Sequence, residues 1–129
     1  MVKASDKKVV YIAHPVKGDI EGNKRRVLDI CREIHTKSKN IIPTAPYITT
    51  LLYLDDNKSK ERRLGIEANK KLFENGGFDE LWLCGTRISE GMKEEVEWCL
   101  KLDIPIYCYN PDLNNEFMKF KLTGKWADE

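Results

Sequence analysis

Three short runs of mostly apolar, strand-forming residues constrain the fold of this chain most strongly. They span residues 9–13, 80–84 and 104–109, and segments with helical spacing of apolar residues lie between them. Near-continuous apolar runs of this length are typical of strands buried on both faces of a parallel sheet. Strands that alternate with helices predict an α/β domain wound by right-handed crossovers.

The helical segments support the same architecture. Val27, Ile30 and Ile34 recur at helical spacing in a helix expected over about 20–37, with Asp19 as its cap. Further helices are expected over 59–74 and 89–102, and weaker signals indicate a strand at 40–43 and a helix from Pro46. We therefore expect a Rossmann-like or flavodoxin-like domain whose parallel sheet has about four to five strands flanked by helices.

The length of 129 residues is that of one domain. We expect a core over about 8–110 and a C-terminal tail over 111–129. Phe117, Phe120 and Trp126 predict that this tail docks on the core or on a neighbouring subunit.

Composition excludes several classes of partner. The formal charge is only +1, so we expect neither a nucleic acid polymer nor a membrane surface as a partner. The four cysteines have no C-x-x-C spacing, which argues against a zinc site and a disulfide framework. The polar start and the absence of a long apolar run predict a soluble, cytoplasmic protein.

Polar residues follow two of the expected strands. Ligands of open parallel sheets bind where the carboxyl ends of the strands lead into helices, which here means residues 13–18 and 85–91. The second loop ends at a helix start, where free N–H groups favour an anion. Ser89 is placed to cap that helix or to bond a phosphate, and Arg87 lies beside it.

The helix at 89–102 offers several carboxylates. Its expected buried stripe is Met92, Val96, Cys99 and Leu100. Glu95 flanks this stripe about one turn from the helix start, whereas Glu94 and Glu97 are expected to point away. Glu95 is therefore the carboxylate expected to face the crevice.

A carboxylate at this position suits attack on the anomeric carbon of a sugar. It can form a covalent glycosyl intermediate and stabilise an oxocarbenium-like transition state. Tyr11, near the end of the first strand, is expected to orient it by a hydrogen bond.

The segments at 10–15, 78–85 and 89–95, followed by 104–106, resemble the nucleoside 2-deoxyribosyltransferase-like superfamily. The resemblance covers residues 9–109 and is strongest to the small, uncharacterised DUF4406-like branch, which is often phage-associated. It implies a cytoplasmic enzyme, or one in the host cytoplasm if phage-encoded.

The resemblance also implies roles for individual residues. Glu95, four residues after the motif glycine Gly91, corresponds to the nucleophile, Tyr11 to its orienting tyrosine and Ser89 to the 5′-phosphate contact. The full set of candidate substrate-binding and phosphate-binding residues, from the two loops and the helices that follow them, is His14, Pro15, Asn69, Gly85, Arg87, Ser89 and Gly91. No metal or other cofactor is implied, and family enzymes are homo-oligomers that complete their sites across subunits.

Two positions depart from the family pattern. His14 stands where family enzymes usually have glycine. Their acid/base aspartate has only Glu67 and Asn69 as near matches in this chain.

Three functions therefore remain open. The first is N-glycosidic bond chemistry on a nucleoside or nucleotide, as a hydrolase or a deoxyribosyltransferase. The second is a non-catalytic protein that binds or sequesters a nucleotide in the same crevice. The third is an interaction protein that uses the scaffold only for assembly.

Overall fold

The computed structural model describes residues 3–126 and has one four-stranded parallel sheet with the order β2-β1-β3-β4. This is the order of the first four strands of the flavodoxin-type doubly wound fold, so the expected α/β class is confirmed. The strands are β1 (Lys8–Ala13), β2 (Ile41–Thr44), β3 (Glu80–Leu83) and β4 (Ile106–Cys108).

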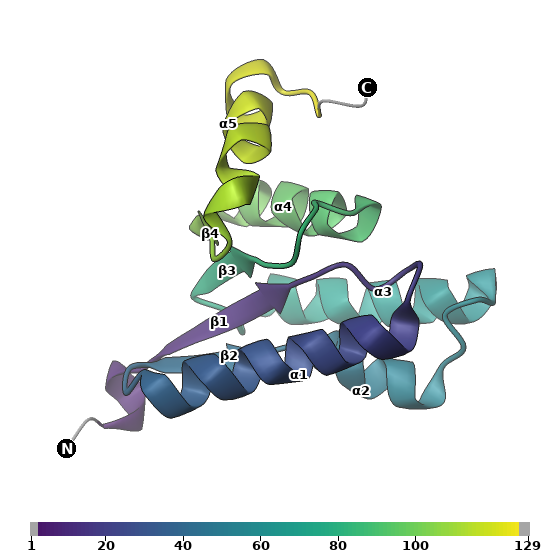
Figure 1. Ribbon diagram of the computed structural model, residues 1–129, viewed down its shortest axis with the longest axis horizontal. Helices are drawn as coiled ribbons and strands as arrows, with labels where there is room; N and C mark the ends of the chain where they lie inside the picture. The colour runs from purple at the N-terminus through teal and green to yellow at the C-terminus, as the bar shows by residue number, and fades with distance from the viewer. Residues whose placement is uncertain (1–2, 127–129) are drawn as a thin grey trace.

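Five helices connect and cover the strands (Figure 1). They are α1 (Ile20–Lys37), α2 (Pro46–Tyr53), α3 (Ser59–Glu74), α4 (Glu90–Leu102) and α5 (Asn114–Thr123). Two short 3₁₀ turns are η1 (Ala4–Asp6) and η2 (Pro111–Leu113). The bounds expected for α1 and α3 are confirmed, and Asp19 caps α1 by accepting a hydrogen bond from the Gly22 N–H at 3.1 Å.

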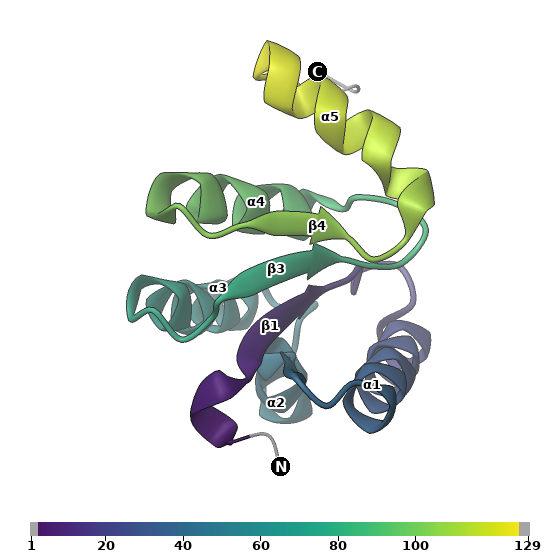
Figure 2. The same cartoon turned by 90° about the vertical axis from the view of Figure 1, so that its left-hand side faces the viewer.

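The helices lie on both faces of the sheet (Figure 2). Val10 and Ile12 of β1 pack against Val27 and Ile34 of α1 on one face. The opposite face carries a larger core, with α3 and α4 packed on it. Its buried members from the sheet and these helices are Tyr11, Ala13, Phe73, Leu81, Leu83, Met92, Val96, Trp98 and Cys99.

The C-terminal tail docks on its own chain. Phe117, Phe120 and Trp126 are all at least nine-tenths buried in the core that α3 and α4 share, and Phe120 stacks on Trp126 with ring centroids 4.0 Å apart. Lys93 of α4 lies over the Trp126 ring at 5.6 Å. The tail therefore covers a side of α4 that the sheet leaves open.

This packing corrects the stripe expected for α4. Leu100 is 45% exposed, although its spacing predicts burial, whereas Lys93 and Trp98 are buried. The reason is that α4 contacts the tail and α3 as well as the sheet, and Trp98 meets Phe73 of α3 edge to face at 5.5 Å. A single apolar stripe does not describe a helix covered on several sides.

The four cysteines form no disulfide within residues 3–126. Cys31, Cys84, Cys99 and Cys108 are free thiols. Burial raises the pKa of Cys84 and of Cys99 to about 12, which keeps both protonated and unreactive. Within residues 3–126, no helix is long and apolar enough to cross a membrane.

Candidate active site

A cavity of about 380 Å³ opens at the carboxyl edge of the sheet. Its size is within the range of small-molecule sites. Its walls come from the loop after β1, from α2 and α3, and from the loop before α4 together with the first turns of that helix. The lining residues are His14, Val16, Lys17, Gly18, Tyr47, Thr50, Leu51, Leu54, Asp56, Glu61, Arg62, Gly65, Ile66, Asn69, Arg87, Ser89, Glu90, Gly91, Met92, Glu94, Glu95 and Trp98.

Three side chains meet at the inner end of this cavity. The Tyr11 hydroxyl, fully buried beneath it, donates a short hydrogen bond to Oε2 of Glu95. The Asn69 amide nitrogen donates to the Tyr11 oxygen at 2.6 Å and to the same Glu95 oxygen at 3.1 Å. Elements far apart in the chain, β1, α3 and α4, thus fix one carboxylate in one orientation.

The surroundings of Glu95 oppose its ionisation. Burial raises the pKa of Glu95 from 4.5 to about 8, and the nearby Glu94 charge adds to the rise, while the hydrogen bonds from Tyr11 and Asn69 lower it. Burial, and then the charge of Glu95, raise the pKa of Tyr11 well above its usual value of 10. Tyr11 therefore remains a hydrogen-bond donor at every physiological pH.

Asn69 has an unused acceptor. The residue is 7% exposed, and its Oδ1 atom is buried without a hydrogen-bond partner among residues 3–126. Buried carbonyl oxygens of this kind are nearly always paired. Because Asn69 also lines the cavity, a ligand hydroxyl or a water molecule is the natural donor to this oxygen.

The N-terminus of α4 forms the part of the cavity lining that is suited to bind an anion. Ser89 accepts a hydrogen bond from the Met92 N–H at 3.3 Å, so it acts as the helix cap. Gly91 has open space where a side chain would lie, with only the Ser89 hydroxyl at 4.0 Å. Backbone N–H groups at such a helix start, with Lys17 and Arg87 in the lining, favour a negatively charged group, against the opposing charges of Glu90 and Glu94 in the same lining.

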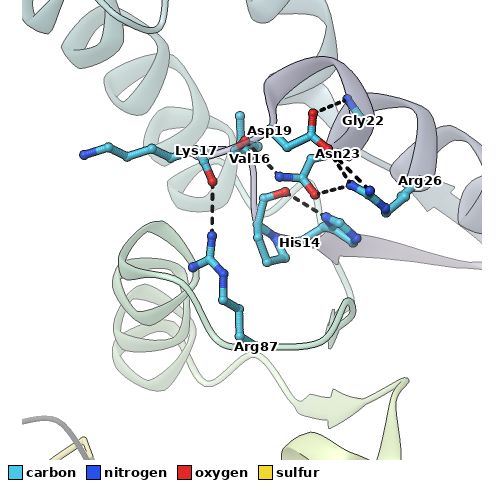
Figure 3. A network of polar contacts seen from close by, with 9 residues as sticks. His14, Val16, Lys17, Asp19, Gly22, Asn23, Arg26 and Arg87 are labelled. Carbon is cyan, nitrogen blue, oxygen red and sulfur yellow. Dashed lines mark hydrogen bonds and ion pairs between the residues drawn. The ribbon is translucent and has the colours of Figure 1, made fainter.

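Arg87 also joins the two loops that carry the site. Its guanidinium donates to the Lys17 carbonyl at 3.1 Å (Figure 3). Figure 3 also shows Asn23, which donates to the Val16 carbonyl at 2.9 Å and accepts from Arg26 at 2.9 Å. The loop after β1 is thereby tied both to α1 and to the loop after β3.

His14 is held in a defined state. It is 6% exposed, and its Nδ1–H donates to the Pro15 carbonyl at 2.7 Å. Burial lowers the pKa of His14, and the charges of Arg26 and Arg87 lower it further, against the effect of the Pro15 carbonyl. The imidazole is therefore neutral at neutral pH, with its lone pair on Nε2.

Gly85 and Pro15 have structural roles instead of lining the cavity. Gly85 has φ +85°, and a Cβ there would lie 2.8 Å from Cδ of Pro15 and 3.2 Å from the His14 ring. Only glycine fits this contact, because a side chain would meet both strain and a clash. Gly85 thus lets the two loops approach each other.

The structure brings together most of the residues singled out from the sequence. The cavity lining contains His14, Asn69, Arg87, Ser89, Gly91 and Glu95, and Tyr11 contacts Glu95 from below. One expectation is wrong, because Glu94 also lines the cavity instead of pointing away, since the wall extends around the first turns of α4. Of the other candidates, Pro15 and Gly85 lie outside the lining, and so does Glu67, which is exposed.

Sequence reasoning identified Asn69 but missed the rest of the wall formed by α2 and α3. Arg62, Ile66 and Asn69 follow the i, i+4, i+7 spacing of one helix face, and all three line the cavity. That spacing could have indicated the face of α3 that lines the cavity, although the many charged residues of this helix make the pattern hard to recognise. No cluster of three metal-ligating side chains occurs within the described part of the chain.

Residues 8–109 match the sequence profile of a family described as Domain of unknown function (DUF7768). No curated protein and no solved structure matches the chain. The family description assigns no reaction, so the chemistry has to be inferred from the site.

Proposed function

Because the chain belongs to the DUF7768 family, whose description names no activity, we propose from its site that it acts on the N-glycosidic bond of a nucleoside or nucleotide. The observation that carries the proposal is the carboxylate of Glu95, held by Tyr11 and Asn69 in the wall of a cavity that also includes the start of α4, where backbone N–H groups favour an anion. A fixed, poorly solvated carboxylate is what nucleophilic attack on an anomeric carbon requires.

The reaction proceeds in two balanced steps. An Oε atom of Glu95 bonds to C1′ of the sugar while the C1′–N bond breaks, and its electron pair leaves with the base, which takes a proton from water. Water or a second base then attacks C1′ and releases the glutamate. Water gives a hydrolase, and a second base gives a deoxyribosyltransferase.

The other residues act on binding and orientation. Tyr11 and Asn69 direct the Glu95 oxygen, and the free Oδ1 of Asn69 accepts a hydrogen bond from a sugar hydroxyl. A 5′-phosphate lies at the start of α4, where Ser89, Gly91 and Arg87 surround it. Asn69 cannot supply a proton, which is why the leaving base takes one from solvent.

The test is chromatographic. Wild type, Glu95→Gln and Glu94→Gln are incubated with deoxynucleosides, ribonucleosides and their 5′-monophosphates, with and without an acceptor base. We expect base release or exchange by wild type and by Glu94→Gln, which changes another carboxylate of the same cavity. Turnover by Glu95→Gln at the wild-type rate would exclude Glu95 as nucleophile.

One observation favours the alternative of a protein that binds or sequesters a nucleotide without cleaving it. With a pKa of about 8, Glu95 is mostly protonated at pH 7 and so is a weak nucleophile. The side chain that contacts it is the amide of Asn69, which cannot act as a general acid. Saturable binding of a nucleotide that is recovered unchanged after long incubation with wild type at pH 8 would establish this alternative.

A further inference from the structure

The cavity continues from Glu95 into an apolar slot between α2 and α3. We define the α2–α3 slot by Thr50, Leu51, Leu54, Gly65 and Ile66, all of which line the cavity. A Cβ at Gly65 would lie 3.6 Å from Oγ1 of Thr50 and 3.7 Å from Cδ1 of Leu54, so the missing side chain leaves room between the helices. Figure 1 shows that these two helices extend beyond the carboxyl ends of the strands.

A charged pair lies at the end of this slot. Nη1 of Arg62 contacts Oδ2 of Asp56 at 3.3 Å, and their side chains are only 33% and 18% exposed. The contact uses one nitrogen and one oxygen, which leaves further donors on Arg62 and the other oxygen of Asp56 for a ligand. Glu61 beside them is already engaged, because it accepts from the Asp55 N–H at 3.0 Å.

The distance from this pair to Glu95 suits a nucleobase. Arg62 and Asn69 lie on one face of α3, seven residues apart, which corresponds to about 10 Å along the helix axis. Asn69 contacts Glu95 directly. A sugar bonded at Glu95 therefore places its base in the α2–α3 slot, with the far edge of the base toward Asp56 and Arg62.

We propose that Asp56 and Arg62 select a guanine base, an inference that rests on the proposed function for the placement of the sugar. Guanine presents the acceptors O6 and N7 to an arginine, and its N1–H and N2–H donors adjoin O6. Arg62 donates to O6 and N7, and Asp56 accepts from N1–H. Adenine carries an amino donor where guanine has O6, so it would direct a donor at Arg62.

The experiment separates binding from turnover. Calorimetric titration gives Kd values of 2′-deoxyguanosine and 2′-deoxyadenosine 5′-monophosphates for wild type, Arg62→Met and Arg63→Met, and chromatography measures turnover of the same compounds. Arg62→Met keeps a long apolar side chain without donors, and Arg63, exposed at the next position of α3, is the matched control.

We expect wild type and Arg63→Met to bind the guanine nucleotide at least about 10-fold tighter than the adenine nucleotide. Arg62→Met should weaken guanine binding about 10-fold to 100-fold and change adenine binding less than about 3-fold. Asp56→Asn should act in the same direction.

The outcomes distinguish the two proposals. A guanine preference that Arg62→Met removes, without turnover by wild type, supports this inference and overturns the glycosidic function. Turnover without a guanine preference supports the function and overturns the inference. A loss of binding that is equal for both bases in Arg62→Met also overturns the inference, whatever the turnover. Absence of both binding and turnover overturns both.

Discussion

Replacing Glu95 by glutamine should stabilise the protein by an amount that grows with pH. In the unfolded chain this carboxyl ionises near 4.5, whereas in the folded protein its pKa is about 8. Between these values the folded state binds more protons than the unfolded state, so the stability of wild type falls as pH rises. Glutamine keeps the shape of the side chain and carries no charge.

The magnitude follows from the same two pKa values. A pKa raised from 4.5 to about 8 corresponds to roughly 5 kcal/mol of unfavourable free energy once Glu95 is fully ionised. Water in the cavity solvates the ionised carboxylate and reduces this penalty. We therefore expect the free energy of unfolding of Glu95→Gln to exceed that of wild type by about 2–4 kcal/mol at pH 9 and by close to nothing at pH 4.5. The gain should appear progressively between those pH values.

Urea denaturation with reductant present, at half-unit intervals from pH 4.5 to 9, measures this difference. Glu97→Gln is the matched control, because Glu97 is an exposed glutamate of the same helix, and its substitution should change stability by less than about 0.5 kcal/mol. A difference between Glu95→Gln and wild type that does not vary with pH, or a variant less stable than wild type at pH 9, would refute the role of burial.

Three further predictions concern rate and packing. Wild-type kcat/KM should rise with pH to a plateau above an apparent pKa near 8 if Glu95 attacks as a carboxylate, and a fall through that range would instead make it an acid. Gly85→Ala should lower the free energy of unfolding by about 2–4 kcal/mol, and Gly76→Ala, which also has positive φ but open space around it, by about 1 kcal/mol. Phe117→Ala should lower the free energy of unfolding by about 3 kcal/mol. Leu122→Ala, at an 81% exposed position, should change it by less than about 0.5 kcal/mol, and urea denaturation measures both variants.

The fold follows closely from local patterns in the sequence. The ends of α1 and α3 were predictable because Asp19 caps the first helix and Gly76 follows the second, and both helices have a charged side and an apolar side. The strand β2 gave a weaker signal because it contains Pro43, which a strand tolerates only at a sheet edge. The observed order places β2 at that edge.

The site was predictable only in part. Tyr11 and Glu95 lie on elements whose direction is set by strand alternation and helix spacing, so their convergence could be inferred. Local spacing places Arg62 on one face of α3 with Asn69, but Asp56 and Arg62 reach the cavity because α2 and α3 pack as a pair beyond the sheet edge, which is a long-range arrangement. The burial of Lys93 and Trp98 in place of Leu100 was missed for the same reason, since it depends on how the tail and α3 pack on α4.

The burial of Glu95 links stability to the proposed chemistry. The same lack of water that destabilises the ionised carboxylate leaves it poorly solvated and therefore reactive toward an electrophilic carbon. Tyr11 and Asn69 lower this penalty with two donors to one oxygen, and in doing so they fix the direction in which the carboxylate faces. A glutamate that served only to stabilise the fold would be better solvated or paired with a cation. The arrangement instead keeps Glu95 at a position where its charge costs stability, which is the pattern expected of a residue retained for function.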